Sequence, residues 1–168
     1  LNIHALSFSS HKLYGPKGTG ALYITRHLPK LHIESIIHGG GQQEGIRPGT
    51  LAVQNIVGLG KACEICESEM MDDDERILKL RNNLLEGLQK IIPDIKINGE
   101  LENRLSGNLN VTVPNIKNSS LMMSLRSIAI SNGSACTSSL PETSHVLKAI
   151  GLSKEAANST IRFGIGRF

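Results

Sequence analysis

The chain has 168 residues, with 18 Lys and Arg against 15 Asp and Glu and a formal net charge of +3. The basic residues are scattered, without the clustered stripe or interleaved aromatics of nucleic-acid-binding domains, so no direct nucleic-acid binding is expected. No apolar run reaches the roughly 18 residues of a membrane span, and three Cys without framework spacing argue against a disulfide-stapled secreted domain. The sequence therefore predicts a soluble, intracellular protein.

Short strands and glycine-rich loops are expected in the first third of the chain. Residues 3–8 have the apolar composition of a short buried strand, residues 21–24 are predicted as a second short strand, and residues 33–37 are a candidate third strand. Residues 9–20 are rich in Gly, Ser and Lys, so a loop bearing functional groups is expected there. Because Leu1 is not an initiator Met and the first residues resemble the end of a structural unit, we expect a piece of a longer protein.

Two helices are predicted in the middle of the chain. Apolar residues recur at helical spacing over residues 51–70, with Thr50 as the N-cap. A second helix is expected over residues 72–92, because four acidic residues at its start favour the positive end of the helix dipole. The acidic run is interpreted as a solvated helix start, and a domain boundary is placed at residues 67–71.

Beyond these helices, strands and helices alternate in an α/β or α+β pattern. Strands are predicted at residues 95–97, 109–113, 128–131 and 160–164, and helices at residues 119–126 and 143–150.

The densest chemistry lies in residues 9–20, which place hydroxyls, an imidazole and a lysine directly after a strand. Glycine-rich loops at strand ends are common ligand sites in α/β sheets. A partly desolvated Lys12 could form a Schiff base, while Ser9 and His11 could hold a phosphate. A lone lysine in a surface loop would be unremarkable, but Ser-x-His-Lys followed by Gly-Pro-Lys-Gly is a longer pattern.

Two groups of cysteines call for different interpretations. Cys136 lies in a Gly-Ser-rich segment after a predicted strand, a context that favours an exposed nucleophilic or redox-labile thiol over a buried inert one. Cys63 and Cys66 form a Cys-x-x-Cys, but no second pair follows and a structural zinc needs four ligands. Helix packing is therefore favoured for this pair, both thiols are expected to be protected, and no metal site is expected.

Arg162 is a charged residue in an otherwise apolar predicted strand. Such a charge needs a partner, either a ligand carboxylate held by both prongs of the guanidinium or an Asp or Glu of the protein. The residues alone leave both possibilities open. Arg167 is expected to be structural.

Four patterns, in order, resemble the cysteine desulfurases of the NifS and IscS type, pyridoxal-phosphate-dependent enzymes of the class V aminotransferase family. They are Ser-Phe-Ser-Ser-His-Lys-Leu-Tyr-Gly-Pro-Lys-Gly, His-Gly-Gly-Gly with Gly-Ile-Arg-Pro-Gly-Thr, Asn-Gly-Ser-Ala-Cys-Thr-Ser, and Ser-Thr-Ile-Arg-Phe. The resemblance covers essentially the whole chain and implies a carboxy-terminal part of such an enzyme. The implied fold is α/β and aspartate-aminotransferase-like, fold type I. Residues 1–67 would end the large cofactor-binding domain, and residues 68–168 would form most of the small domain.

By this resemblance the cofactor is pyridoxal 5'-phosphate. Lys12 matches the lysine that carries it, Ser9 and His11 match its phosphate ligands, and Thr50 matches a residue that reaches the phosphate of the other subunit of a homodimer. Pro48 stands where Ser is commoner, which is a modest departure from the family pattern.

The resemblance also implies the reaction, in which L-cysteine becomes L-alanine and its sulfur becomes a persulfide on Cys136. Arg162 matches the clamp on the substrate carboxylate. Sulfur would pass to an iron-sulfur scaffold protein or another acceptor, for cluster assembly or tRNA thiolation, in the bacterial cytoplasm or an organelle matrix. Because the family chain is over twice this length, the fragment alone is expected to lack part of the active site.

Two alternatives remain beside the desulfurase. One is a non-catalytic fragment or interaction module that docks to a scaffold protein. The other is a related enzyme on the same cofactor, such as a selenocysteine lyase, which the segment around Cys136 disfavours.

Overall fold

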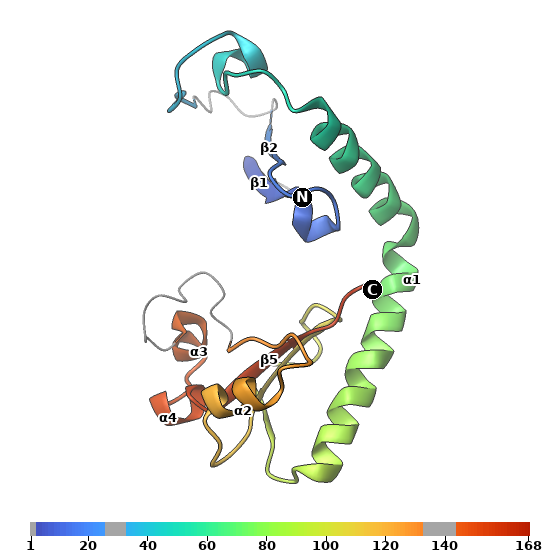
Figure 1. Ribbon diagram of the computed structural model, residues 1–168, viewed down its shortest axis with the longest axis vertical. Helices are drawn as coiled ribbons and strands as arrows, with labels where there is room; N and C mark the ends of the chain where they lie inside the picture. Colours follow the sequence, from blue (N-terminus) through green and yellow to red (C-terminus); the bar gives the residue numbers. More distant parts are fainter. Residues whose placement is uncertain (1–2, 26–32, 133–143) are drawn as a thin grey trace. The chain divides into compact units, whose positions relative to one another are not determined.

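The computed structural model describes residues 3–25, 33–132 and 144–168 (Figure 1). The chain divides into two compact units, Leu1–Met70 and Met71–Phe168. A two-stranded sheet belongs to the first unit and a three-stranded sheet to the second. In the part of the chain that is described, no helix is both long and apolar enough to cross a membrane.

The first unit is built on an antiparallel hairpin. Strands β1 (Ala5–Ser9) and β2 (Gly20–Ile24) pair along their whole length. Both strands were predicted, but the prediction that the first is buried is wrong, because Leu6 is 46% exposed, much like Leu22 of β2 at 50%. The cause is that their apolar side chains meet no second sheet layer within the described residues.

The connection between β1 and β2 begins with a 3-10 turn, η1 (Ser10–Leu13), which ends at Tyr14 in the left-handed region with φ 61°. The candidate third strand at residues 33–37 is irregular. After it comes a second short 3-10 segment, η2 (Gln42–Gly45).

One helix, α1 (Val53–Ile91), replaces the two predicted helices. It runs without interruption through residues 67–71, so the helix end predicted there is wrong, whereas the division between the two compact units falls between Met70 and Met71, within that range. It also begins after Thr50, which is therefore not its N-cap. The acidic run lies in the helix interior, where carboxylates find basic partners three or four residues later on the same face.

These ion pairs explain why the acidic run stays helical. Glu75 Oε1 lies 2.6 Å from Lys79 Nζ, and Asp73 Oδ1 lies 3.0 Å from Arg76 Nη2. The second oxygen of Asp73 lies 2.5 Å from Arg167 Nε, near the end of the chain. The hydrogen bond from Arg76, and then the one from Arg167, hold the pKa of Asp73 below its usual value. Arg167 thus has the structural contact expected of it.

Replacing Asp73 by asparagine should lower the melting temperature of the whole protein at neutral pH. A carboxyl whose folded-state pKa is depressed stabilises the fold above its unfolded-state pKa, and this contribution is lost as pH falls through the folded-state value. The gap between wild type and Asp73→Asn should therefore begin to narrow below about pH 4 and close as pH falls through the lower folded-state pKa of Asp73. Thermal melts over pH 2–7 measure it, with exposed Asp74→Asn as the control. An equal gap at every pH would contradict the ion-pair explanation.

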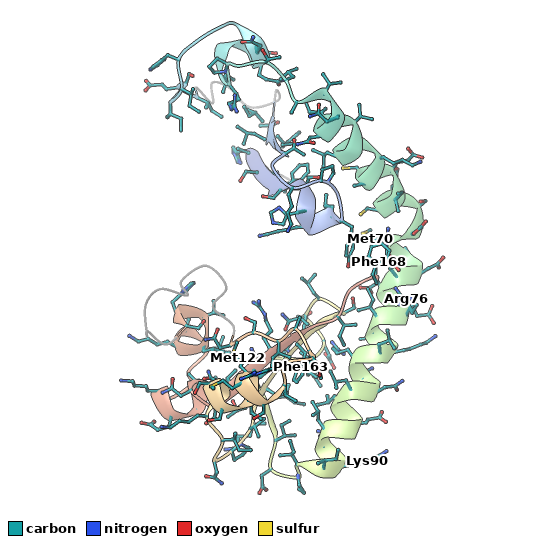
Figure 2. All side chains as sticks on the ribbon, viewed as in Figure 1. Met70, Arg76, Lys90, Met122, Phe163 and Phe168 are labelled. Carbon is teal, nitrogen blue, oxygen red and sulfur yellow. The ribbon has the colours of Figure 1, made fainter. Side chains whose placement is uncertain are left out.

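The second unit has its core between α1 and one face of its sheet. Strands β3 (Lys96–Ile97), β4 (Asn108–Thr112) and β5 (Thr160–Gly164) are antiparallel and adjacent in that order. Phe163 of β5 packs against the buried core (Figure 2). This core consists of Leu85, Ile95, Leu109, Val111 and Val113.

Short helices follow the strands of this unit. They are α2 (Asn118–Ser124), α3 (His145–Ala149) and α4 (Lys154–Ala157). The helices predicted near α2 and α3 are confirmed, whereas α4 was not predicted. The strand predicted at residues 128–131 is reduced to one bridge, in which Ser131 pairs with Arg162.

Strand β4 gives the sheet two chemically different faces, because successive side chains point to opposite sides. Leu109 and Val111 enter the core, while Asn108, Asn110 and Thr112 lie on the other face. Thr160 and Arg162 of β5 pair with Thr112 and Asn110, so they extend the same polar face. This polar face lines a pocket that also contains Arg162.

Candidate active site

Neighbouring side chains of the turn η1 differ sharply in exposure. Ser10 is completely buried, whereas His11 and Lys12 are exposed. Ser9 occupies the N-cap position, but its hydroxyl makes no capping hydrogen bond. The three polar side chains predicted to bind a ligand, Ser9, His11 and Lys12, therefore lie within four positions around one turn, and none of these side chains has a hydrogen-bond partner among the described residues.

Helix α1 packs against the loop that follows this turn, at Pro16 and Lys17. Asn55 Nδ2 approaches the carbonyl oxygen of Lys17 at 3.5 Å. One helical turn later, a Cβ built on Gly58 would lie only 2.5 Å from Cγ of the Pro16 ring. Glycine at this position lets the helix backbone come close to the loop that carries Lys12.

Replacing Gly58 by alanine should disturb this loop, whereas the same change at Gly60 should not. Nothing lies within 4 Å of a Cβ on Gly60. Gly60→Ala should raise the free energy of unfolding by up to about 1 kcal/mol through helix propensity. The free energy of unfolding of Gly58→Ala should be about 1–3 kcal/mol lower than that of Gly60→Ala, because overpacking against Pro16 offsets the gain in helix propensity. Chemical denaturation of the two variants of the whole protein measures the difference. Equal stabilities would refute the close packing.

The two helix cysteines differ in exposure. Both lie in α1 as expected, but the prediction that both are protected is wrong for Cys63, which is exposed. Cys66 is half-buried, and its Sγ lies 3.9 Å from the carbonyl oxygen of Leu13 at the end of η1. Cys66 therefore adds another contact between α1 and η1, the turn that carries Lys12 and is called the lysine turn below.

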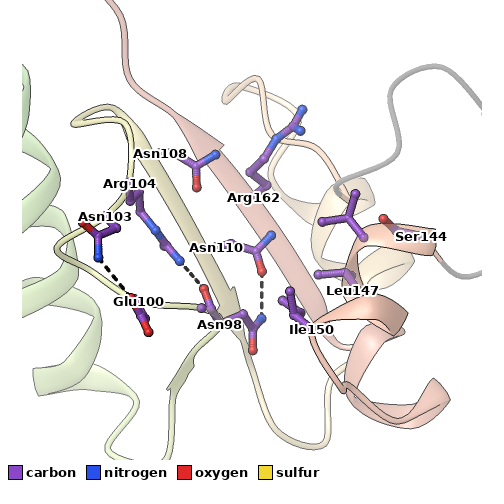
Figure 3. Close-up of a pocket in the computed structure, with 12 residues that line it drawn as sticks. Asn98, Glu100, Asn103, Arg104, Asn108, Asn110, Ser144, Leu147, Ile150 and Arg162 are labelled. Atoms are coloured by element: carbon purple, nitrogen blue, oxygen red, sulfur yellow. Dashed lines mark hydrogen bonds between the residues drawn. The ribbon is translucent and has the colours of Figure 1, made fainter. Parts of the chain in front are cut away.

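Arg162 lies in a pocket of the second unit with a volume of about 320 Å³, shown in Figure 3. The polar face of the sheet forms one side of this pocket, and Leu147 and Ile150 of the α3 region form an apolar side. Among the residues that are described, Arg162 has no acidic partner. The internal salt bridge considered as an alternative is therefore not formed within them.

Two described residues that flank the segment carrying Cys136 lie at or beside the Arg162 pocket. Ser131 exchanges two backbone hydrogen bonds with Arg162, of 2.7 and 3.2 Å. Ser144, the first described residue after the segment, lines the pocket and is buried. Cys136 itself, with residues 133–143, lies outside the described residues.

Thr50 lies in the first unit beside a different cavity, of about 540 Å³. It is exposed and follows Gly49, whose φ is 106°. No hydrogen bond joins its side chain to the lysine turn in the described parts of the chain. The structure thus brings together Ser9, His11 and Lys12, and leaves Thr50 apart from them.

The polar amides beside Arg162 were missed by the sequence interpretation. Asn98, Asn108 and Asn110 line the pocket with it. The signal that could have found two of them is the alternation Asn-Leu-Asn-Val in a predicted strand, which places both amides on one face.

Comparisons with known proteins agree on one family. The aminotransferase class-V model matches residues 1–168. The chain belongs to this family. It is 51% identical over 168 residues to the cysteine desulfurase IscS of Pasteurella multocida and 49% identical to that of Ruthia magnifica, covering all of this chain and 41% of each relative. The chain thus spans about two fifths of the length of these curated relatives.

Solved structures support the same family. A NifS-like protein superposes with a TM-score of 0.85 at 36% identity, covering 99% of this chain and 42% of its own. The NifS-like protein of Rickettsia africae gives 0.84 at 30% identity, covering 98% and 42%. The predicted α/β fold of fold type I is confirmed, as is the resemblance to cysteine desulfurases. Enzymes of this family depend on pyridoxal phosphate.

Proposed function

We propose that this chain belongs to a cysteine desulfurase and supplies its cofactor lysine, its sulfur-accepting cysteine and its substrate clamp. The whole protein would convert L-cysteine to L-alanine and keep the sulfur as a persulfide. The observation that carries this proposal is the 51% identity to curated cysteine desulfurases across every residue of the chain. Lys12, Cys136 and Arg162 all lie within that match.

The residues of the lysine turn fit pyridoxal phosphate chemically. Lys12 offers an exposed primary amine for the aldehyde, and Ser9 and His11 offer donors for the phosphate. Thr50 would offer its hydroxyl to the phosphate held by the partner of a homodimer. When bound, the cofactor supplies an electron sink for deprotonation at the substrate Cα. Lys12 then accepts and returns the proton at this carbon through its amine.

Cys136 would act as the nucleophile toward the substrate sulfur. Its thiolate forms an S–S bond as the C–S bond of the substrate breaks, so that one L-cysteine and one thiol give one L-alanine and one persulfide. Cys136 follows Ser131 by five positions in the sequence. Ser131 pairs with Arg162, and this closeness along the chain supports a nucleophile that acts on a substrate bound by Arg162.

Arg162 would bind the carboxylate of L-cysteine through its guanidinium fork. Its half-buried position and lack of an acidic partner among the described residues leave the fork available. The persulfide would then pass to an acceptor, such as an iron-sulfur scaffold protein.

The proposal is tested by the stoichiometry of the whole protein loaded with pyridoxal phosphate. With L-cysteine and no thiol acceptor, a burst of about one alanine per subunit is expected, with the extra sulfur on Cys136. Added dithiothreitol should restore continuous turnover. Continuous alanine release from selenocysteine but not from cysteine would instead favour a selenocysteine lyase. Absence of alanine from both substrates would favour a non-catalytic interaction module.

A further inference from the structure

Asn110 lies beside Arg162 and lines the same pocket. The two residues are directly opposite each other on β4 and β5, and both are half-buried. Figure 3 shows the Asn110 amide next to the stem of Arg162, with its oxygen turned toward Asn98.

The orientation of this amide is set by a hydrogen bond from Asn98. Asn98 Nδ2 lies 2.8 Å from Asn110 Oδ1. The oxygen of Asn110 is therefore occupied, and its Nδ2 is left on the other side of the amide. In the parts of the chain that the structure describes, this nitrogen has no hydrogen-bond partner. A donor in a pocket is thus available to a ligand.

The hydroxyls of Thr160 and Thr112 explain why Asn98 donates its hydrogen bond to Asn110 and does not accept one from it. Thr160 Oγ1 donates to the carbonyl oxygen of Ala156 at 2.8 Å, and a carbonyl can only accept. The Thr160 oxygen is then left to accept, and Thr112 Oγ1 lies 2.9 Å from it. Thr112 Oγ1 lies 3.0 Å from Asn98 Nδ2 and 3.1 Å from Asn98 Oδ1. Because its single hydrogen is directed to Thr160, it accepts from Nδ2 instead of donating to Oδ1. The second hydrogen of this nitrogen points to Asn110.

Asn98 is also held through its backbone. Its carbonyl oxygen accepts from Arg104 Nη2, and its backbone N–H donates to the carbonyl oxygen of Asn110 at 2.9 Å. Asn98 itself is buried, with 7% of its surface exposed. Because backbone and side chain are both fixed, Asn98 presents its donor to Asn110 in one orientation.

We propose that Asn110 Nδ2 donates a hydrogen bond to the carboxylate that Arg162 binds, and that Asn98 is a positioning residue that keeps this donor facing the pocket. The inference rests on the proposed role of Arg162. A carboxylate has about four lone-pair sites and a guanidinium fork uses two, so it can accept a further N–H. The pair Arg162 and Asn110 therefore selects an anionic planar group and fixes its orientation.

The test compares Asn110→Asp with Asn115→Asp in the whole enzyme. Asn110→Asp keeps an oxygen for Asn98 but turns an anionic oxygen toward the substrate carboxylate. The KM for L-cysteine should rise about tenfold or more with a smaller change in kcat, because a ground-state contact is lost. Asn115 is exposed at φ 64° in the turn after β4, where Asp is tolerated. Its variant makes the same charge change and should stay within about twofold of wild type.

The positioning role of Asn98 is tested by a double-mutant cycle. Asn98→Ala and Asn110→Ala should each raise the KM for L-cysteine several-fold, and the double variant should be no worse than Asn110→Ala alone. Additive effects would overturn the role of Asn98. If Asn98→Ala does not fold, the Asn110→Asp comparison still decides whether Asn110 contacts the substrate.

Failure of this inference is distinguishable from failure of the proposed function. Arg162→Lys removes the fork and should raise the KM for L-cysteine. If Arg162→Lys has this effect while Asn110→Asp matches Asn115→Asp, Asn110 does not contact the carboxylate and only the further inference is overturned. If Arg162→Lys leaves the KM unchanged, the carboxylate site itself is refuted, together with the inference that depends on it.

Discussion

Replacing Cys136 by serine in the whole protein should abolish persulfide formation and lower alanine production by roughly a thousandfold or more, as expected when a nucleophile is removed. Serine keeps the size of the side chain but lacks the sulfur that forms the S–S bond. The variant should still show the visible absorption of the bound cofactor, and L-cysteine should still perturb that absorption. Mass spectrometry of tryptic peptides after cysteine treatment measures the loss of the added sulfur.

Cys63 provides the matched control for this experiment. It is an exposed thiol on α1, so it tests whether any accessible cysteine can accept sulfur. Cys63→Ser should keep the activity of wild type, with the added sulfur on Cys136. Sulfur found on Cys63 or Cys66 in the wild type, or normal alanine release by Cys136→Ser, would show that the sulfur acceptor is elsewhere.

Local sequence patterns were sufficient for most of the elements. Strand β4 was predictable because its Leu109 and Val111 alternate with polar residues, as a half-buried strand requires. Helix α1 was predicted as two helices, because a run of acidic residues was interpreted as a helix start. Asp73 is stabilised inside the helix by Arg167, 94 positions away, and no local pattern contains that contact.

In the candidate site, too, some features could be predicted from local sequence and others depend on contacts between distant residues. Ser9, His11 and Lys12 are consecutive or nearly so, and one short turn suffices to gather them, so their proximity could be inferred from sequence. Asn98 and Asn110 meet only through the register of β3 and β4. The direction of their hydrogen bond depends on Thr112 of β4 and Thr160 of β5. The amino-acid sequence alone does not show that these four side chains are neighbours.

Pairing across strands also has a consequence for the reaction. Both backbone polar groups of Arg162 bond Ser131, and Arg162 stands opposite Asn110 of β4, so the proposed clamp is a strand residue rather than a loop residue. Strand positions hold side chains more rigidly than loops do. A substrate carboxylate bound there would have a fixed position relative to the start of the Cys136 segment.

Replacing Lys12 by alanine should have the other large effect. The amine of Lys12 is the proposed attachment point of the cofactor and the proposed proton carrier at the substrate Cα, so kcat should fall by about 100- to 10,000-fold. The side chain is exposed and lies at the end of a short turn, so its loss should leave the melting temperature of the cofactor-free protein almost unchanged.

Lys17 is the matched control, because it is an exposed lysine in the same loop. Lys17→Ala should keep most of the activity, whereas Lys12→Arg, which retains the positive charge but offers no primary amine, should be as inactive as Lys12→Ala. Borohydride reduction of the wild type followed by peptide mapping should leave the pyridoxyl group on Lys12, since only the lysine bonded to the cofactor is trapped. A label on Lys17 would show that the cofactor is attached to that lysine instead. An active Lys12→Arg variant would show that Lys12 contributes its positive charge and not a covalent bond.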